Sequence, residues 1–336
     1  MLVVLIVINL RGVDIFAKVQ NVVAYGLIGS LVIMGIVGCL KLGNGEVITQ
    51  PAVVSGNPQD IINMCGLAFF LFIACEYVVP ISNQVKNPRR NVPLGMVLSL
   101  IVILVMQSLL VIGFYHYTPW EELAVSASPH LLYGYYILGS IGKGWMTLVS
   151  ILAVVSTANS IISSLSYILT GMAKIGLLPA FFMKTNKKGA PYFSILLIGG
   201  IMLIINATGL STSDELSFMI LAASVFIMIA YVATHINVLI LRRRLPKAPR
   251  TFKIPGGFVL PVMGIIGTLW MIWNIAADMA LRLSIYRLVG IIFVIIAVYG
   301  VAWVKGRLKR NLFQSMPLEK VMAMENEKYY MYHKKN

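Results

Sequence analysis

Long apolar runs separated by short polar segments make up most of this chain. A transmembrane helix needs about 20 consecutive apolar residues to cross the hydrocarbon core of a bilayer. Eight runs approach or exceed that length, at residues 19–40, 61–82, 94–115, 144–170, 191–209, 217–241, 258–277 and 288–305. The pattern therefore predicts an all-α protein, a polytopic membrane helix bundle with about eight transmembrane helices.

The opening residues, MLVVLIVINLRG, form an apolar run that is too short to span a bilayer. They lack the basic leading region and the small-residue cleavage site of a signal peptide. The run is typical of the last turns of a helix, so we expect a helix that begins upstream of Met1.

Composition and charge support the membrane interpretation. Only 12% of the residues are charged and 59% are hydrophobic, whereas soluble domains carry about 25% charged residues. The net charge of +15 has two readings, a nucleic-acid partner or the excess of Lys and Arg in cytoplasmic loops.

The distribution of charge decides between these readings. Of the 27 Lys and Arg, 23 fall in alternate connections and in the tail; the exceptions are Lys41, Lys143, Arg282 and Arg287. This alternation predicts a multi-pass plasma-membrane protein, with a membrane domain at 1–305 and a cytoplasmic tail at 306–336. No nucleic-acid partner is predicted, because the charges sit in separate short loops.

Glu76 is the one acidic residue well inside a predicted span, and Pro80 follows it by four residues. Proline has no backbone N–H, so the Glu76 carbonyl is expected to lose its helical partner. A carboxylate and a freed carbonyl at one depth could form a cation or proton site. The alternative is a neutral Glu76 that bonds a neighbouring helix and has a structural role.

A row of polar residues marks the fourth span. Steps of three and four place its members on one helical face: Ser156, Asn159, Ser160, Ser163 and Tyr167. The face could be a hydrophilic wall along a permeation path, or a seam of small residues where helices pack closely. Asn159 is the residue that packing explains least.

No catalytic signature is present. The sequence contains no HExxH, GxSxG or P-loop motif, so we do not expect an enzyme. Its three cysteines lie in or beside apolar runs without a CxxC spacing. We therefore predict no metal site and no cofactor.

Four segments, in order, resemble the amino acid–polyamine–organocation (APC) superfamily of amino acid permeases. They are NLRGVDIFAKVQN (9–21), FFLFIACEYVVPISNQVKNPRRNVPLG (69–95), GMAKIGLLPAFFMKTNKKGAP (171–191) and LRRRLPKAPRTFKIPGG (241–257). The resemblance implies a fold of twelve helices built on two five-helix inverted repeats. The eight spans would then be helices five to twelve, so the chain would lack the first four.

In this superfamily the substrate lies between broken helices one and six, where unwound backbone holds its carboxylate and amine. The resemblance assigns residues 69–76 to the sixth-helix half of the site. Phe70 would be an aromatic gate, and Ile73 and Ala74, followed by Cys75, the substrate-facing turn. Glu76 would be the acid linked to gating or protonation.

The polar face of the fourth span would add to this site. Asn159 and Ser163 would contact substrate. Ser160 and Ser164 lie where sodium-coupled relatives of the fold supply hydroxyls. Two departures stand out: many relatives have Gly at Ala74, and the lysine of some proton-coupled relatives, expected near 26–28, is missing.

The sequence thus predicts a secondary active amino acid transporter that works by alternating access, present as an incomplete chain. Its expected partners are an amino acid, membrane lipid, and H⁺ or Na⁺ as a coupling ion; its oligomeric state stays open. The alternative is a non-transporting protein, either a truncated remnant or a subunit of a split membrane protein.

Overall fold

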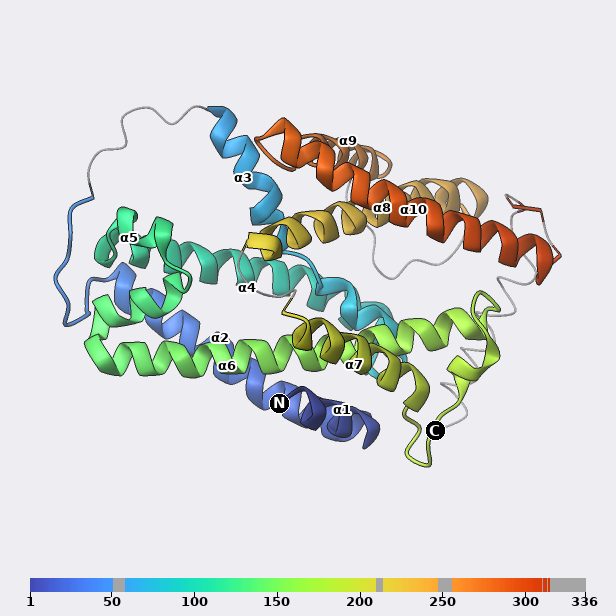
Figure 1. The fold of residues 1–336 in the computed structure, drawn as a ribbon, viewed down its shortest axis with the longest axis horizontal. Coiled ribbons are helices and arrows are strands. Elements are labelled where there is room, and N and C mark those ends of the chain that lie inside the picture. Colours follow the sequence, from blue (N-terminus) through green and yellow to red (C-terminus); the bar gives the residue numbers. More distant parts are fainter. Residues whose placement is uncertain (51–57, 210–213, 247–255, 310, 313, 315–336) are drawn as a thin grey trace. The chain divides into compact units, whose positions relative to one another are not determined.

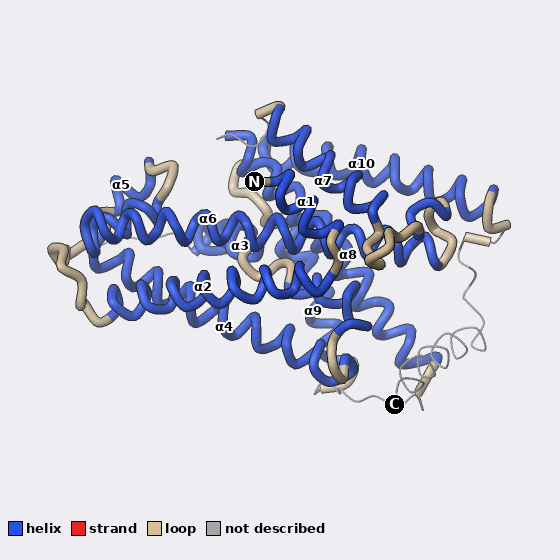
Figure 2. Tube along the Cα trace, turned by 90° about the horizontal axis from the view of Figure 1, so that it is seen from below, coloured by secondary structure: helices blue, strands red, loops and turns tan. Residues whose placement is uncertain are grey.

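The structure is a computed structural model that describes residues 1–50, 58–209, 214–246, 256–309, 311–312 and 314. Over these residues it contains helices and loops, with no strand (Figures 1 and 2). The elements are α1 (Leu2–Leu10), α2 (Val13–Cys39), α3 (Pro58–Phe70), η1 (Cys75–Gln84), α4 (Pro88–Tyr117), α5 (Trp120–Val125), α6 (Pro129–Lys174), η2 (Ala180–Met183), α7 (Tyr192–Ala207), α8 (Asp214–Arg244), α9 (Val259–Trp273) and α10 (Met279–Gly306).

The prediction of an all-helical membrane protein is confirmed. Among the described residues, five helices are long and apolar enough to cross a membrane, namely α2, α4, α6, α8 and α10. Three shorter apolar helical segments occupy the remaining predicted spans, at Ala68–Ser82, Tyr192–Ala207 and Val259–Trp273. Every span expected from the apolar pattern therefore corresponds to a helical segment.

Most of the long helices begin before their apolar runs, and the difference is greatest for α6 and α10. α10 starts at Met279 rather than near 288 because the Asp278 carboxylate accepts bonds from the N–H groups of Ala280 (3.3 Å) and Leu281 (2.9 Å). Such a cap satisfies the free N–H groups of a first turn. α6 is extended by a shorter helical piece that joins it at a kink, where Leu138 and Gly139 have non-helical backbone angles.

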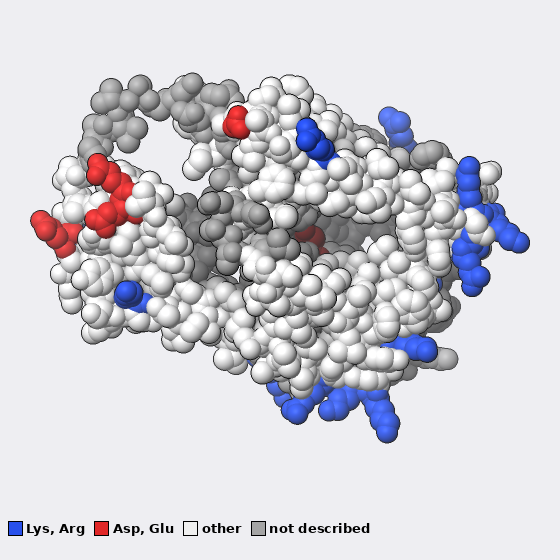
Figure 3. Space-filling view, in the orientation of Figure 1, with Lys and Arg blue, Asp and Glu red and all other residues white. Residues whose placement is uncertain are grey.

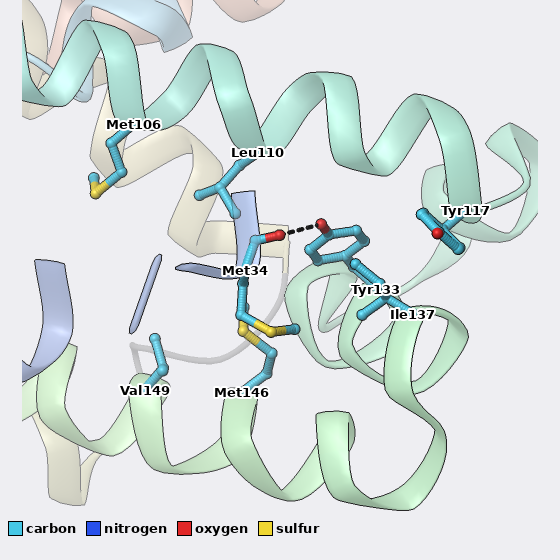
Figure 4. Close-up of a cluster of buried hydrophobic side chains, with 8 residues drawn as sticks. All are labelled: Met34, Met106, Leu110, Tyr117, Tyr133, Ile137, Met146 and Val149. Carbon is cyan, nitrogen blue, oxygen red and sulfur yellow. Dashed lines mark hydrogen bonds between the residues drawn. The ribbon is translucent and has the colours of Figure 1, made fainter. Parts of the chain in front are cut away.

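The chain forms two compact units, Met1–Val289 and Gly290–Asn336. In the first unit, α2, α4 and α6 pack on one another around a cluster of buried side chains (Figure 4). The cluster consists of Met34, Met106, Leu110, Tyr117, Tyr133, Ile137, Met146 and Val149. Its one hydrogen bond in Figure 4 runs from the Tyr133 hydroxyl to the Met34 carbonyl, at 2.8 Å.

Glycines allow this close packing. The Tyr133 ring lies where side chains on Gly38 of α2 and Gly113 of α4 would otherwise sit. A Cβ added to Gly113 would lie 2.9 Å from the ring carbon that carries the hydroxyl. Tyr133 therefore fits between α2 and α4 only because both positions are glycine.

A second cluster holds α8 in place. Leu221, Val225 and Met228 of α8 pack against Ile275 and against Ile285 of α10. Phe69, near the end of α3, is partly buried against the same cluster. This packing brings α8 beside the end of α3, which becomes important below.

Large apolar side chains remain exposed along the spans, for example Leu104, Ile151 and Ile266. An apolar exterior is what a helix in lipid requires. On the face drawn in Figure 3, acidic side chains gather around α5, which carries Glu121 and Glu122, and the basic side chains lie mainly elsewhere.

Candidate transport site

The second predicted span is a broken helix. The α-helix α3 ends at Phe70, the chain turns through 71–74, and a 3₁₀ helix, η1, begins at Cys75. Ala74 closes the turn with a φ of 81°, in the left-handed region that residues with a Cβ rarely adopt. The backbone N–H of Tyr77 then bonds the Ala74 carbonyl at 3.1 Å, which starts the new helix.

The break lies before Glu76 rather than at Pro80, so the expectation about the freed carbonyl is wrong in detail. Pro80 lies inside η1. In a 3₁₀ helix each N–H reaches back three residues, so the missing N–H of Pro80 deprives the Tyr77 carbonyl. The Ser164 hydroxyl donates to that carbonyl at 3.0 Å. α6 therefore replaces the bond that proline removes.

Glu76 occupies the first turn of η1 and is tied to α8. The Tyr231 hydroxyl donates to Glu76 Oε2 at 2.9 Å. The thiol of Cys75 approaches the same oxygen, at 3.6 Å. The Tyr231 ring also meets the Phe69 ring edge to face, with centroids 5.9 Å apart. A half-buried carboxylate, a tyrosine and an aromatic pair thus meet at the break.

The structure distributes the predicted substrate residues along this break. Phe70 is the last residue of α3 and is 39% exposed, while its neighbour Phe69 makes the contact with Tyr231. Ile73 and Ala74 lie in the turn. The N–H groups of Leu71, Phe72 and Ile73 bond carbonyls three residues back, so the turn is irregular rather than unbonded. Irregular backbone at membrane depth is tolerated only where protein or an enclosed cavity surrounds it.

The predicted polar face of α6 divides between two partners. Ser164 is buried and bonds η1, as described above. Asn159 is fully buried, and its amide instead bonds Asn9 of α1 (2.9 Å) and Gln20 of α2 (3.2 Å). Ser163 is buried between these two positions and Ser160 is half-buried. The predicted polar face is therefore a packed seam at Asn159, whereas Ser164, predicted separately, belongs to the broken-helix site.

The sequence analysis did not predict the partners of three polar residues near this site: Tyr231, Gln20 and Asn9. Tyr231 lies inside an apolar run, one turn before His235, and nothing local indicates that it faces Glu76. Gln20 and Asn9 each lie at an end of an apolar run, where a polar residue is ordinary. Only the packing of separate helices pairs them.

Parts of the predicted organisation lie outside the described residues. They include most of the tail 306–336 and the basic loop residues 247–255. His235, in contrast, is described, and its imidazole packs where a side chain on Gly264 of α9 would sit.

The family comparison agrees with this geometry. The amino acid permease family profile matches residues 1–304. Two branched-chain amino acid permeases named BcaP are each 24% identical to this chain. The one from Bacillus subtilis aligns with 69% of this chain and 49% of its own length. The one from Lactococcus lactis aligns with 85% and 62%, respectively.

A third relative carries a different name. The putrescine transporter PotE of Haemophilus influenzae is 25% identical over 81% of this chain and 62% of its own length. The chain thus spans about half to three-fifths of the length of these relatives.

Proposed function

The chain belongs to the amino acid permease family, and from that premise we propose that it carries the sixth-helix half of a secondary active amino acid transporter. It is a multi-pass membrane protein of a transporter family and not an enzyme. The observation that carries the proposal is the broken helix at 71–74, with the Glu76 carboxylate held by Tyr231 directly after the break.

The break suits the recognition of an amino acid. Interrupted helices in transporters offer free carbonyls to cations and free N–H groups to carboxylates. In the turn 71–74 the Ile73 N–H bonds the Phe70 carbonyl and the Ala74 carbonyl accepts from Tyr77. The groups offered to a substrate would therefore be the Ile73 carbonyl and the Ala74 N–H, next to Cys75 at the start of η1. The aromatic residues Phe69 and Phe70 flank the turn on the α3 side.

Glu76 is the proposed coupling residue. An ionisable group within a membrane span is costly unless it serves a pathway or a partner. Its bond from Tyr231 ties the broken helix to α8, and loss or gain of a proton on Glu76 would change that bond. We therefore favour H⁺ as the coupling ion. The hydroxyls of Ser160 and Ser164 would take part if the ion were Na⁺.

Alternating access would move helices around this site, and the tail would lie in the cytoplasm. Both proposals rest on the family's architecture and on the alternation of basic loops along the sequence. A reporter fused after residue 309 and read from either side of the membrane tests the orientation.

Branched-chain amino acids are the first substrates to test because two relatives are named for them. We expect cells expressing the gene product that contains this chain to accumulate radiolabelled leucine, isoleucine or valine in a saturable way. Putrescine belongs in the same panel because of the third relative. The control is the same cells with an empty vector.

Saturable uptake of putrescine alone would move the substrate class from amino acids to polyamines. Uptake no greater than in the control for amino acids and polyamines, with the protein folded in the membrane, would contradict the transport proposal. That result would favour a non-transporting subunit.

A further inference from the structure

A chain of hydrogen bonds crosses three helices away from the broken helix. The Asn9 amide of α1 donates to Asn159 Oδ1 (2.9 Å), and Asn159 donates to Gln20 Oε1 of α2 (3.2 Å). Gln20 Nε2 then donates back to the Ser156 hydroxyl of α6 (2.7 Å). Asn159 and Gln20 each accept a hydrogen bond from one neighbour and donate one to the next, so this amide chain has a defined order.

Gln20 is the member that joins α2 to α6. Its two partners, Ser156 and Asn159, are three residues apart and therefore neighbours on one face of α6. The amide oxygen is bonded to one and the amide nitrogen to the other. Gln20 thus makes two hydrogen bonds to α6, and both would break if this part of α2 moved away from α6.

α1, the helix that precedes α2, is held in place by hydrogen bonds of its own. α1 is attached to α6 through Asn9, and its last carbonyl, that of Leu10, accepts a bond of 2.7 Å from the Asn186 amide. The chain then passes from α1 to α2 through Gly12, whose φ of 104° lies in the region that favours glycine. α2 therefore leaves a fixed helix end through a residue whose backbone conformation a side chain would disfavour.

We propose that Gln20 is a positioning residue of the transport cycle: it fastens the first turns of α2 to α6, and this part of α2 moves away from α6, with the chain bending at Gly12, when both Gln20 bonds open. The inference rests on the proposed transport function, since it assigns the bonds a role in alternating access. α6 also carries Ser164, five residues beyond Asn159, which holds the Tyr77 carbonyl of the broken helix. We call the two bonds from Gln20 to Ser156 and Asn159 the Gln20 clamp. α6 thus connects the Gln20 clamp to the candidate site.

Burial explains why this connection has two states rather than a range. Gln20 and Ser156 are half-buried, but Asn159 is 0% exposed, so water cannot easily replace Gln20 as its partner. An unsatisfied amide in an apolar interior is unfavourable, which holds the clamp either fully bonded or opened far enough to admit water.

The test measures the separation of α2 and α6 directly. Spin labels go on cysteines introduced at Val22 of α2 and Ile151 of α6, which are 75% and 52% exposed. The gene product is reconstituted in lipid nanodiscs with its native cysteines replaced by alanine. Distances between the labels are measured by pulsed electron resonance without substrate.

Gln20→Leu removes both bonds to α6. We expect it to raise the population of a longer distance about fivefold, the change that roughly 1 kcal/mol produces. Ser156→Ala removes one bond and gives a smaller rise. Added to Gln20→Leu, Ser156→Ala changes nothing further, because its partner is already gone.

The matched control is Gln107→Leu, the same substitution at a half-buried glutamine of α4, which should leave the distances unchanged. The proposal is overturned if the label-distance distribution of Gln20→Leu is identical to that of the native protein, or if Gln107→Leu shifts the distribution equally.

Uptake by the same proteins tests the transport function separately from the role of Gln20. If the protein transports but the label distance does not change in Gln20→Leu, the role of Gln20 is rejected and the transport function stands. If the label distance changes but no variant transports, the transport function is rejected and the two Gln20 bonds still hold α2 to α6.

Discussion

At the scale of single residues, the backbone of Ala74 and the side chain of Glu76 define the candidate site. Ala74 holds a left-handed conformation at the end of the break, and Glu76 is bonded to Tyr231 within the next turn. The first is a steric feature and the second an electrostatic one. They can therefore be tested by different measurements.

Ala74→Gly should stabilise the protein. Glycine adopts a φ of 81° without a clash of Cβ, and the expected gain is about 0.5–1 kcal/mol. The melting temperature of the purified protein in detergent should rise by a few degrees. Ala153→Gly, inside the regular helix α6, is the matched control and should lower it. A lower melting temperature for Ala74→Gly would show that the left-handed backbone is not strained.

Tyr231→Phe should weaken transport through Glu76 rather than through packing, because the ring keeps its contact with Phe69. A double-mutant cycle with Glu76→Gln should show a coupling of about 1–2 kcal/mol in initial uptake rate. Tyr25→Phe, on the exposed surface of α2, is the control and should be silent. Additive effects of the two substitutions would mean that the hydrogen bond does not operate during transport.

At the scale of elements, glycine contacts decide how closely α2, α4 and α6 approach. Tyr133 fills the space that Gly38 and Gly113 leave and bonds the Met34 carbonyl (Figure 4). This contact fixes one end of α2, and the Gln20 clamp lies nearer the other end. Packing at one end and hydrogen bonding at the other hold the helix in place.

Gly113→Ala should destabilise the protein by about 1–3 kcal/mol, because the new methyl group overlaps the Tyr133 ring. Tyr133→Phe should cost about 1 kcal/mol by leaving the Met34 carbonyl without that donor. The double variant should lose less than the sum, since the deleted oxygen relieves part of the overlap. Gly29→Ala, where the added atom meets open space, serves as the control for thermal unfolding. Equal melting temperatures for Gly113→Ala and Gly29→Ala would contradict this account.

The sequence predicted elements better than contacts, for a physical reason. A helix surrounded by lipid needs apolar side chains along its length, so the spans could be predicted from the local sequence. Their ends depended on single caps such as Asp278, which lies outside any apolar run. The break was assigned to the right segment by resemblance, but Pro80 alone pointed to the wrong carbonyl, since that inference assumed an α-helix rather than a 3₁₀ helix.

Pairings between helices could not be read from the sequence. Glu76 and Tyr231 are 155 residues apart, and Asn9 and Asn159 are 150 apart. Neither partner carries a local signal of the other. In the sequence, Asn159 stands out because the packing of small residues explains an amide side chain least. Whether that partner was a substrate or another helix depended on the tertiary packing.

At the scale of the whole molecule, family membership and the broken helix converge. The family match extends over nearly all the described helices, and the break with its carboxylate lies where the resemblance predicted the substrate. An amino acid carrier whose second described span is interrupted beside Glu76 is the central claim of this account. Coupling of transport to protons at Glu76 is its most specific consequence.

The most direct measurement is leucine uptake into proteoliposomes that hold the gene product containing this chain, at external pH values from about 5 to about 8. Uptake should rise with the inward proton gradient. Glu76→Gln should lower the rate at acidic pH by roughly tenfold and abolish the pH dependence, because an amide cannot take the place of a carboxylate as a proton carrier. Glu46→Gln, an exposed acid in the loop after α2, should leave the profile unchanged. A Glu76→Gln profile that matches the native one would contradict the account.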